Sequence, residues 1–209
     1  MSGVPDVFAR IGRSANLLVS GIVGAGKTTL VRKIVRTKVA TSGAEVRWVD
    51  MRDTTVASLR RTLEDLRRRD GLSRLTVLVV DEVHGISRAD LHGELGTLLE
   101  SAMEPCSRAP WRGREHRVRT ILTSYDPGVF RDAFGSLVDA QCQKILAGTA
   151  TADGLSWLDP RLVPHTEDPS DRHTLGRGLY LPRQASAEED PMDLVQPFWA
   201  SRRDRLALR

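Results

Sequence analysis

Residues 16–30 read NLLVSGIVGAGKTTL. The apolar run from Leu17 to Val19 is typical of a buried strand, and the pattern from Leu30 onward predicts a helix with one apolar face. Between them lies Gly21-x-x-x-x-Gly26-Lys27-Thr28, the pattern of a phosphate-binding loop, in its required position between strand and helix. The sequence therefore predicts a strand, a glycine-rich turn and a helix that together bind a phosphate group.

The residue types in this loop suit the phosphates of a nucleotide. Glycines let successive backbone N–H groups turn inward around an anion without a Cβ clash, and the N-terminus of the following helix attracts the same negative charge. Lys27 is expected to reach the β- and γ-phosphates of ATP, and the Thr28 hydroxyl to bind Mg²⁺. The alternative is a glycine-rich turn with a surface lysine. The predicted nucleotide-binding residues of the loop are Gly21, Gly24, Ala25, Gly26, Lys27, Thr28 and Thr29.

A second motif lies in residues 75–82, which read LTVLVVDE. Its continuous apolar and β-branched run is typical of a central parallel strand that is buried on both faces. Asp81 is predicted to hold Mg²⁺ directly or through water, and Glu82 to orient or deprotonate the attacking water. Lys27 and Glu82 are therefore the expected catalytic residues, and Thr28 and Asp81 the expected metal site. The alternative is a pair of exposed acids at a strand end.

Polar residues also end the strand that is expected at residues 118–123. Thr123 and Ser124 are expected at the carboxyl edge of the sheet, where open α/β sheets bind ligands. Two roles are open for them: one of them contacts the γ-phosphate, or they cap the turn before Pro127. Although the string from Asp81 to His84 is similar to helicase signatures, His84 is expected to be a packing or hydrogen-bonding residue.

The order of these patterns predicts an α/β fold, a three-layer P-loop NTPase of the RecA/ASCE type with a mostly parallel central sheet flanked by helices. Strands are expected at residues 16–20, 45–49, 75–82, 118–123 and 143–147, with an edge strand at 176–181. The first helix is expected to run to about Thr37, followed by a polar connector over residues 38–44. Residues 1–181 are expected to form the ATPase domain, and residues 182–209 a polar linker and a C-terminal tail.

The composition suits one domain without a membrane span. The chain has 209 residues, of which 40% are hydrophobic, and a formal net charge of +4, which fits one α/β domain with an ordinary core. The N-terminus lacks the apolar segment of a signal peptide, and no apolar run approaches the roughly 20 residues of a membrane-spanning helix. Cys106 and Cys142 lack metal-ligand spacing and fit free thiols. We therefore expect a cytoplasmic protein with no membrane span of its own.

Arginine is concentrated in two segments that are candidates for contact with DNA. One is the outer face of the helix predicted after Asp53, and the other is the irregular segment 104–116 and its flank. A phosphate backbone attracts such clusters, but a run of charge is more often a solvated face. Both interpretations stay open from the sequence. The arginines are Arg60, Arg61, Arg67, Arg68 and Arg69 on the helix, and Arg108, Arg112, Arg114, Arg117 and Arg119 in and after the segment.

With these segments placed, much of residues 10–150, and patches up to residue 181, resemble the motor domain of the FtsK/HerA branch of P-loop ATPases, which are double-stranded DNA translocases. The similar segments are RSANLLVSG (13–21), VD (49–50), VVDE (79–82), ILTS (121–124), RDAFG (131–135) and GRGLY (176–180). The resemblance implies ATP, Mg²⁺, double-stranded DNA as partner, and a homo-oligomer, as in that family's hexameric rings. There a neighbour's arginine completes each site, and the candidates here are Arg108, Arg112, Arg114 and Arg131. The family usually has Gln at the position of Ser124.

Three functions are compatible with these patterns. The first is an ATPase that couples hydrolysis to movement along DNA. The second is an AAA+ or signalling-type ATPase, such as a helicase loader, which would normally add a helical lid domain. The proline- and glycine-rich sequence after Leu158 does not favour such a lid. The third is a nucleotide-binding switch or scaffold with little turnover, and Glu82 argues against it.

Overall fold

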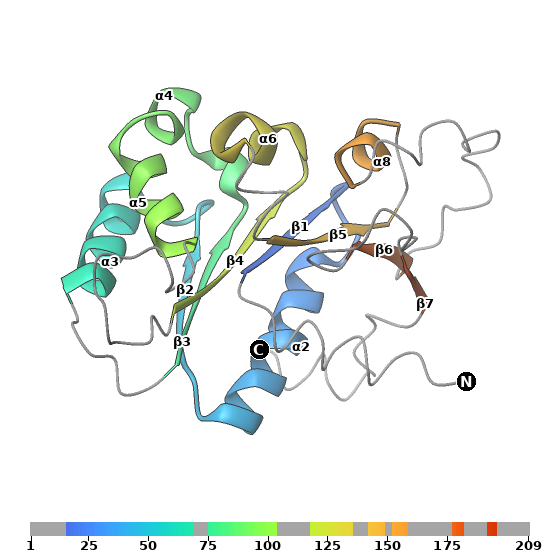
Figure 1. Ribbon diagram of the computed structural model, residues 1–209, viewed down its shortest axis with the longest axis horizontal. Helices are drawn as coiled ribbons and strands as arrows, with labels where there is room; N and C mark the ends of the chain where they lie inside the picture. Colours follow the sequence, from blue (N-terminus) through green and yellow to red (C-terminus); the bar gives the residue numbers. More distant parts are fainter. Residues whose placement is uncertain are drawn as a thin grey trace.

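The computed structural model describes residues 16–68, 75–103, 118–135, 142–148, 152–158, 177–181 and 192–195. They form a seven-stranded sheet in the order β2-β3-β4-β1-β5-β6-β7 (Figure 1). The five strands from β2 to β5 run parallel, and β6 and β7 extend the sheet in antiparallel pairing. The strands are β1 (Asn16–Gly21), β2 (Glu45–Asp50), β3 (Thr76–Asp81), β4 (Val118–Ser124), β5 (Cys142–Ala147), β6 (Arg177–Leu181) and β7 (Met192–Val195).

Helices cover both faces of the sheet, so the fold has three layers (Figure 1). The long helix α2 lies on one face, and the remaining helices lie on the other. This is the predicted α/β architecture, and the prediction of the fold class is confirmed. The helices are α2 (Lys27–Ser42), α3 (Val56–Arg68), the 3-10 turn η1 (Val83–Gly85), α4 (Arg88–Leu91), α5 (Glu94–Met103), α6 (Gly128–Phe134) and α8 (Ala152–Leu158).

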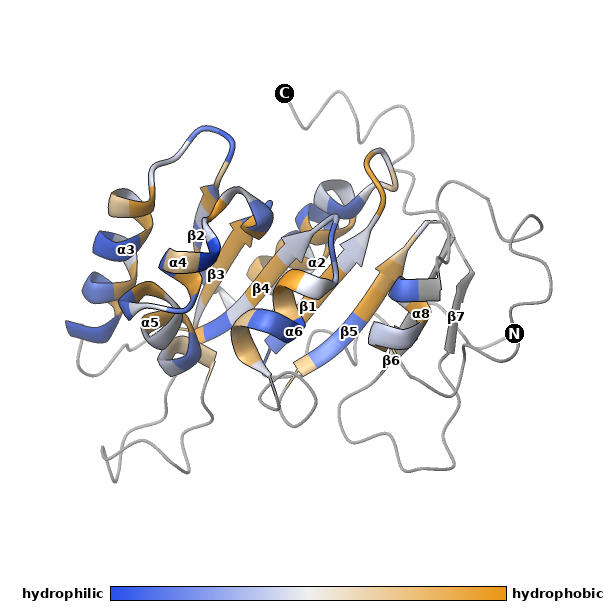
Figure 2. Ribbon diagram, turned by 90° about the horizontal axis from the view of Figure 1, so that it is seen from above, coloured by the Kyte–Doolittle hydropathy of each residue, from blue (hydrophilic) through white to orange (hydrophobic). Residues whose placement is uncertain are grey.

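Alternation along the strands builds a core on each face of the sheet. Leu17 and Val19 of β1 pack in the core under α2, whereas Leu18 packs in the core under α3, α5 and α6, because successive side chains of a strand point to opposite faces. β3 is buried along its whole length, as expected for a central parallel strand. Figure 2 shows β3 as largely hydrophobic, and α3 as carrying hydrophilic residues.

The carboxyl ends of the parallel strands meet at one edge of the sheet. The register pairs Asp50 of β2 with Asp81 of β3, and Ser20 of β1 with Ser124 of β4. The backbone N–H of Met51 also donates to the carbonyl oxygen of Asp81 at 3.0 Å. Side chains that are far apart in the sequence are therefore brought together at this edge.

Most strand boundaries differ from the sequence predictions by one residue, and two regions differ by more. The predicted connector over residues 38–44 is wrong, because α2 continues to Ser42, where Gly43 takes a left-handed conformation and its N–H donates to the Val39 carbonyl oxygen. β7 lies within residues 182–209, for which the sequence predicts a linker and a tail, and it pairs with β6.

Some features predicted from the sequence lie outside the described residues, among them the arginine-rich segment 104–116, Cys106 and Arg69. Cys142 is described, and its side chain is buried in β5. Within the described residues, no helix has both the length and the apolar character that crossing a membrane requires.

Candidate nucleotide-binding site

The loop between β1 and α2 turns through three glycines with positive φ. These angles are 146° at Gly21, 81° at Gly24 and 86° at Gly26. At Gly21 an added Cβ would lie 2.0 Å from the carbonyl oxygen of Ala147 in β5, so the strand pair leaves no space for a side chain. Gly24 and Gly26 have open space around them, but other residue types rarely adopt their backbone angles. The course of the loop therefore depends on glycine at each position.

Backbone N–H groups of this loop are available to a ligand. The amides of Gly24 and Gly26 form no hydrogen bond with any described residue. Gly26 is also the N-cap of α2 and provides no side-chain cap, so the first amides of the helix lack an acceptor as well. Unpaired amides at the start of a 16-residue helix form a site that favours an anion.

Lys27 places its amine beneath this loop. Its side chain is only 5% exposed, and Nζ donates to the carbonyl oxygens of Gly21 at 2.8 Å and Ile22 at 3.2 Å. Burial lowers the pKa of Lys27, and the nearby carboxylates of Glu82 and Asp81 partly offset this effect. The amine therefore lies where the loop and the two acids at the end of β3 meet.

Asp81 joins α2 to β3 and β4. It is fully buried, and its Oδ2 accepts a hydrogen bond from the Thr28 hydroxyl at 3.0 Å. Its Oδ1 accepts a second hydrogen bond from the Thr123 hydroxyl. Two predicted metal-site residues, Thr28 and Asp81, are thus in direct contact, although 53 positions separate them in the chain.

Glu82 is held in an unusual backbone conformation next to this cluster. It is the one non-glycine residue with positive φ in the described part of the chain, at 61°. Its backbone N–H donates to the Thr123 hydroxyl at 2.9 Å, so Thr123 contacts both acids at once. A left-handed conformation costs a non-glycine residue on the order of 1–3 kcal/mol and is frequent at functional sites. Its presence here supports a functional constraint on the direction of the Glu82 side chain.

His84 packs beside the Glu82 carboxylate. Its Nδ1 lies 3.2 Å from Glu82 Oε2, without the geometry of a hydrogen bond. The imidazole also lies against the ring of Tyr125, with 4.0 Å between ring centroids. Burial lowers the pKa of His84, and the Glu82 carboxylate opposes this effect in part. The lowered pKa favours the uncharged form of the ring.

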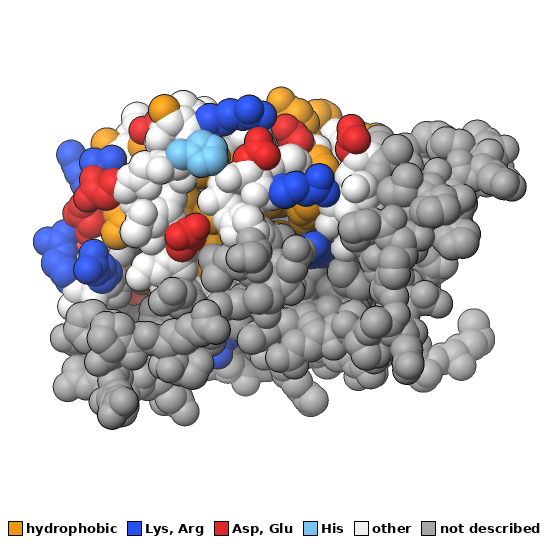
Figure 3. Space-filling model, turned by 45° about the horizontal axis from the view of Figure 1, so that its top comes forward, with side chains coloured by type: hydrophobic (Ala, Val, Ile, Leu, Met, Phe, Trp, Pro, Cys, Tyr) orange, Lys and Arg blue, Asp and Glu red, His pale blue; other side chains and the backbone are white. Residues whose placement is uncertain are grey.

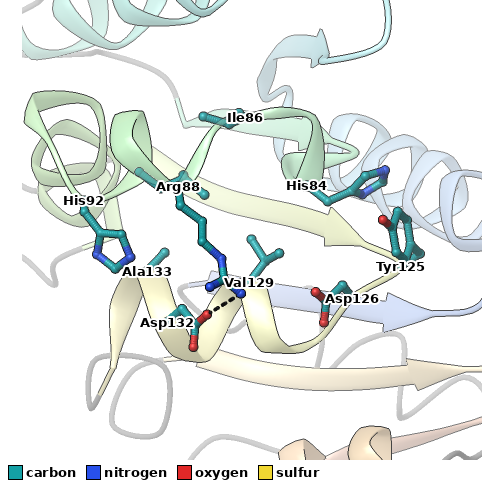
Figure 4. Close-up of a pocket in the computed structure, with 10 residues that line it drawn as sticks. His84, Ile86, Arg88, His92, Tyr125, Asp126, Val129, Asp132 and Ala133 are labelled. Atoms are coloured by element: carbon teal, nitrogen blue, oxygen red, sulfur yellow. Dashed lines mark ion pairs between the residues drawn. The ribbon is translucent and has the colours of Figure 1, made fainter.

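A pocket of about 180 Å³ lies beyond this pair, between η1–α4 and the turn from β4 into α6 (Figure 4). His84, Tyr125 and Asp126 line it, together with the ion pair from Arg88 to Asp132 at 3.2 Å. None of the loop residues 21–29 lines this pocket. It is therefore distinct from the predicted phosphate site.

The structure separates the roles left open for the two polar residues at the end of β4. Ser124 caps the following turn, because its Oγ accepts a hydrogen bond from the Asp126 N–H at 3.0 Å. Thr123 contacts the two acids instead. Contact between either residue and a γ-phosphate stays a prediction. Of the other predicted loop residues, Ala25 is buried and Thr29 lies half-buried in the first turn of α2.

Arg52 is a residue at this edge that sequence reasoning missed. It follows the end of β2, and its guanidinium forms two hydrogen bonds with the Asp50 carboxylate, from Nε at 2.9 Å and from Nη2 at 2.6 Å. The Asp50 carboxylate raises the pKa of Arg52, mainly through its hydrogen bond, and Asp81 and Glu82 add to the effect. The sequence could have pointed to Arg52, because it closely follows a predicted parallel strand. The carboxyl ends of such strands meet at one edge of the sheet, where ligands bind.

This arrangement fits a nucleoside triphosphate with Mg²⁺. The loop offers unpaired amides and a lysine to the phosphates, and Thr28 and Asp81 offer two oxygen donors. Mg²⁺ is usually bound by one or two protein oxygens, with substrate phosphates and water as the other ligands. The described residues hold no group of three or more His, Cys, Asp or Glu side chains that would suggest a different metal site.

A glycine-rich loop between β1 and α2, strand-end acids on β3 and this strand order define a P-loop nucleotide-binding protein. The chain belongs to the ATPase family associated with various cellular activities (AAA), whose sequence profile matches residues 17–144. A sequence comparison with the curated proteins finds no match.

Among solved structures, the chain is similar to the pCW3 conjugation coupling protein TcpA in monomer form with ATPgS. The TM-score is 0.61 at 14% identity, and the similarity covers 88% of this chain and 60% of TcpA. It is also similar to the genome packaging NTPase B204 of Sulfolobus turreted icosahedral virus 2 in complex with AMPPCP, with a TM-score of 0.53 at 14% identity over 88% of this chain and 98% of B204. At these identities the similarity concerns the fold.

Proposed function

We propose that this chain is an ATPase that couples the hydrolysis of ATP to movement along double-stranded DNA, as an FtsK-like motor. The observation that carries the proposal is the series of contacts from Thr28 to Asp81, Thr123 and Glu82, which joins the loop to both acids. The names of similar structures, a conjugation coupling protein and the DNA-packaging ATPase B204, support DNA as the partner. We also propose that it works in the cytoplasm as a homo-oligomer, as a hexameric ring.

Each residue of the site has a distinct part in this mechanism. Lys27 and the amides of Gly24 and Gly26 bind the phosphates. Thr28 and Asp81 hold Mg²⁺, which neutralises phosphate charge when bound. Glu82 orients the attacking water and accepts its proton. Thr123 keeps the two acids in a fixed relation, since it bonds to both of them.

The described elements after β5 favour the motor over a helicase loader. A loader-like ATPase would continue from this point into a helical lid. Here the described residues after β5 are the seven-residue helix α8 and the antiparallel strands β6 and β7. The AAA family match itself favours the loader-like alternative as a second candidate, and the experiment below separates the two.

Two of the four arginines of α3 are paired with acids, which favours a solvated face over a DNA-binding one. Arg60 lies 3.2 Å from the Glu94 carboxylate, and Arg68 lies 3.4 Å from that of Glu64. Figure 3 shows acidic and basic side chains interspersed on this side of the molecule. A DNA backbone would instead favour a surface of one sign.

ATP turnover measured with and without duplex DNA tests the proposal, with Glu82→Gln as the key variant. We expect turnover that DNA stimulates and that Glu82→Gln abolishes, while ATP binding is retained because the loop is unchanged. Turnover that is indifferent to DNA would favour the loader-like alternative. Binding without turnover would favour a nucleotide switch, and either result would overturn the motor.

A further inference from the structure

Arg52, just after the carboxyl end of β2, is a cation that has no role in the mechanism proposed above. Arg52 lies two residues after Asp50, which is in register with Asp81. The intervening residue, Met51, is bonded to the backbone of Asp81 at 3.0 Å. The backbone of Arg52 is thereby fixed one strand away from the two acids.

The Asp50 carboxylate orients this guanidinium from one side. Its Oδ1 accepts from both the backbone N–H of Arg52 at 3.0 Å and Nε at 2.9 Å, and its Oδ2 accepts from Nη2 at 2.6 Å. A paired hydrogen bond of this kind fixes direction as well as charge. Asp50 is 19% exposed and Arg52 is 59% exposed, so the anchor is largely covered and the guanidinium faces outward. Nη1 forms no hydrogen bond with any described residue.

The charge of Arg52 acts on the catalytic cluster. Its guanidinium lowers the pKa of Lys27, in the same direction as burial. Asp81 and Glu82 in turn stabilise the guanidinium. The charge of Arg52 therefore reaches the three charged residues that are predicted to bind the phosphates, the metal and the attacking water.

Arg47, within β2 itself, shows what an ordinary surface ion pair looks like in this chain. Arg47 lies 2.6 Å from Glu45, with 40% and 39% of the two side chains exposed. This pair lies in the first half of β2, whereas Arg52 comes after the last residue of the strand. It resembles the Arg52 pair in its chemistry and differs in its place, so it supplies a matched control.

We propose that Arg52 is a catalytic arginine supplied by the chain itself, and that its guanidinium contacts the terminal phosphate of bound ATP while Asp50 acts as its positioning residue. The proposal rests on the proposed ATPase function. In hydrolysis the water oxygen forms a bond to the γ-phosphorus, and the bond to the β–γ bridging oxygen breaks. ADP keeps the electron pair, and the water proton passes to Glu82. Arg52 stabilises negative charge on the transferring group, a role that guanidinium groups have in phosphoryl transfer.

The first test replaces Arg52 by Ala and measures both turnover and the binding of a transition-state analogue. We expect kcat to fall by roughly 100-fold or more, since removing one preorganised donor costs on the order of 10²–10³. ADP with aluminium fluoride should bind Arg52→Ala at least about tenfold more weakly, while ADP alone binds as in the wild type, because only the analogue mimics the transferring group. The unfolding temperature should change little, because an exposed ion pair contributes little to stability.

Three further variants sharpen this result. Arg47→Ala should keep both the turnover and the analogue affinity of the wild type. Arg52→Lys should recover part of the lost turnover, because charge returns without the paired geometry. Asp50→Asn should lower kcat less than Arg52→Ala, and combining it with Arg52→Ala should add almost nothing. Additive losses would mean that Asp50 does not act through Arg52.

A mixing experiment separates an arginine acting within its own chain from one donated to a neighbour. Arg52→Ala is co-expressed with Lys27→Ala, which retains Arg52 but lacks the phosphate lysine. No recovery of turnover is expected, and recovery would show that Arg52 acts across chains. Wild-type turnover in Arg52→Ala would overturn the inference and leave the ATPase intact. A wild-type chain without turnover would refute the proposed function instead.

Discussion

Two buried threonines of β4, three residues apart, belong to polar clusters of opposite character. Thr120, near the amino end of the strand, donates to Asn16 Oδ1 at 2.7 Å, and the Asn16 amide donates to the Met103 carbonyl oxygen. Thr123, near the carboxyl end, donates to Asp81 and accepts from the Glu82 N–H. The first cluster is neutral and ties β1, β4 and the end of α5 together.

The second cluster differs in charge and in what it leaves unpaired. Its centre is the fully buried carboxylate of Asp81, with the amine of Lys27 close by. Next to it, Glu82 has a left-handed backbone, and the loop amides of Gly24 and Gly26 lack acceptors. In this chain the buried polar network that indicates a ligand site is the one that is charged and borders unpaired donors. The neutral network has its hydrogen bonds satisfied and stabilises the fold alone.

The largest effect that this comparison predicts is that of Lys27→Ala. Nucleotide binding or turnover should be abolished, because the amine is the positive charge of the phosphate site. The fold should be retained, since Nζ bonds only to loop carbonyl oxygens among the described residues. Binding of a fluorescent ATP analogue, ATP turnover and thermal unfolding measure the three quantities.

Lys33→Ala is the matched control for this variant, because Lys33 is an exposed lysine on the same helix. It should bind nucleotide like the wild type. Wild-type turnover in Lys27→Ala would remove the distinction between the two clusters and refute the assignment of the loop.

Much of the charged cluster could be predicted from the sequence, because its parts are local motifs. The spacing from Gly21 to Thr28 specifies a loop between a strand and a helix, and an apolar strand that ends in Asp81 and Glu82 specifies the facing acids. The helix following the loop was predicted too short, because Lys38, Thr41 and Ser42 give this segment the polar character of a connector. The helix in fact continues until Gly43.

The remaining features depend on register between distant strands, which one sequence does not reveal. Thr123 was predicted at the correct edge, but its simultaneous contact with Asp81 and Glu82 follows from the pairing of β3 with β4. The place of Arg52 follows likewise from the pairing of β2 with β3. The sequence likewise gives no indication that Asn16 bonds to Thr120 and Met103, because both partners are distant in the chain.

Two Thr→Val substitutions on β4, one in each cluster, test the comparison of the two clusters. Their expected effects are smaller than that of Lys27→Ala. Thr123→Val removes the donor to Asp81 and the acceptor for the Glu82 N–H, so we expect kcat to fall roughly 10- to 100-fold as the acids lose their relative position. Thr120→Val removes one neutral hydrogen bond, which should lower the free energy of unfolding by about 1 kcal/mol and leave kcat unchanged.

Steady-state kinetics and urea unfolding of the two variants give both quantities. The Thr120 N–H still donates to Asn16 Oδ1 at 3.2 Å in the absence of the hydroxyl, so the neutral cluster keeps part of its bonding. Equal losses of kcat in the two variants would contradict the division into a structural and a functional cluster.

The smallest expected effect is a pH dependence of the free energy of unfolding, and it should come from His84, which lies beside the charged cluster. Burial lowers the pKa of His84, although Glu82, Asp126 and Asp81 oppose the shift and Lys27 reinforces it. Below the ordinary histidine pKa of about 6.5, the unfolded chain therefore binds a proton that the folded chain does not. The free energy of unfolding should fall as the pH drops from about 6.5 toward the lowered pKa.

His84→Gln removes this contribution and keeps a polar side chain of similar size. Urea unfolding of the wild type and the variant between about pH 7.5 and about pH 5.5 should show a steeper loss of stability in the wild type. The neutral cluster around Asn16 has no titrating group among its contacts, so Thr120→Val should follow the pH profile of the wild type. A flatter profile in the wild type than in His84→Gln would mean that His84 is held protonated against Glu82. The Glu82 carboxylate would then be paired with a cation at neutral pH and less able to accept the proton of water.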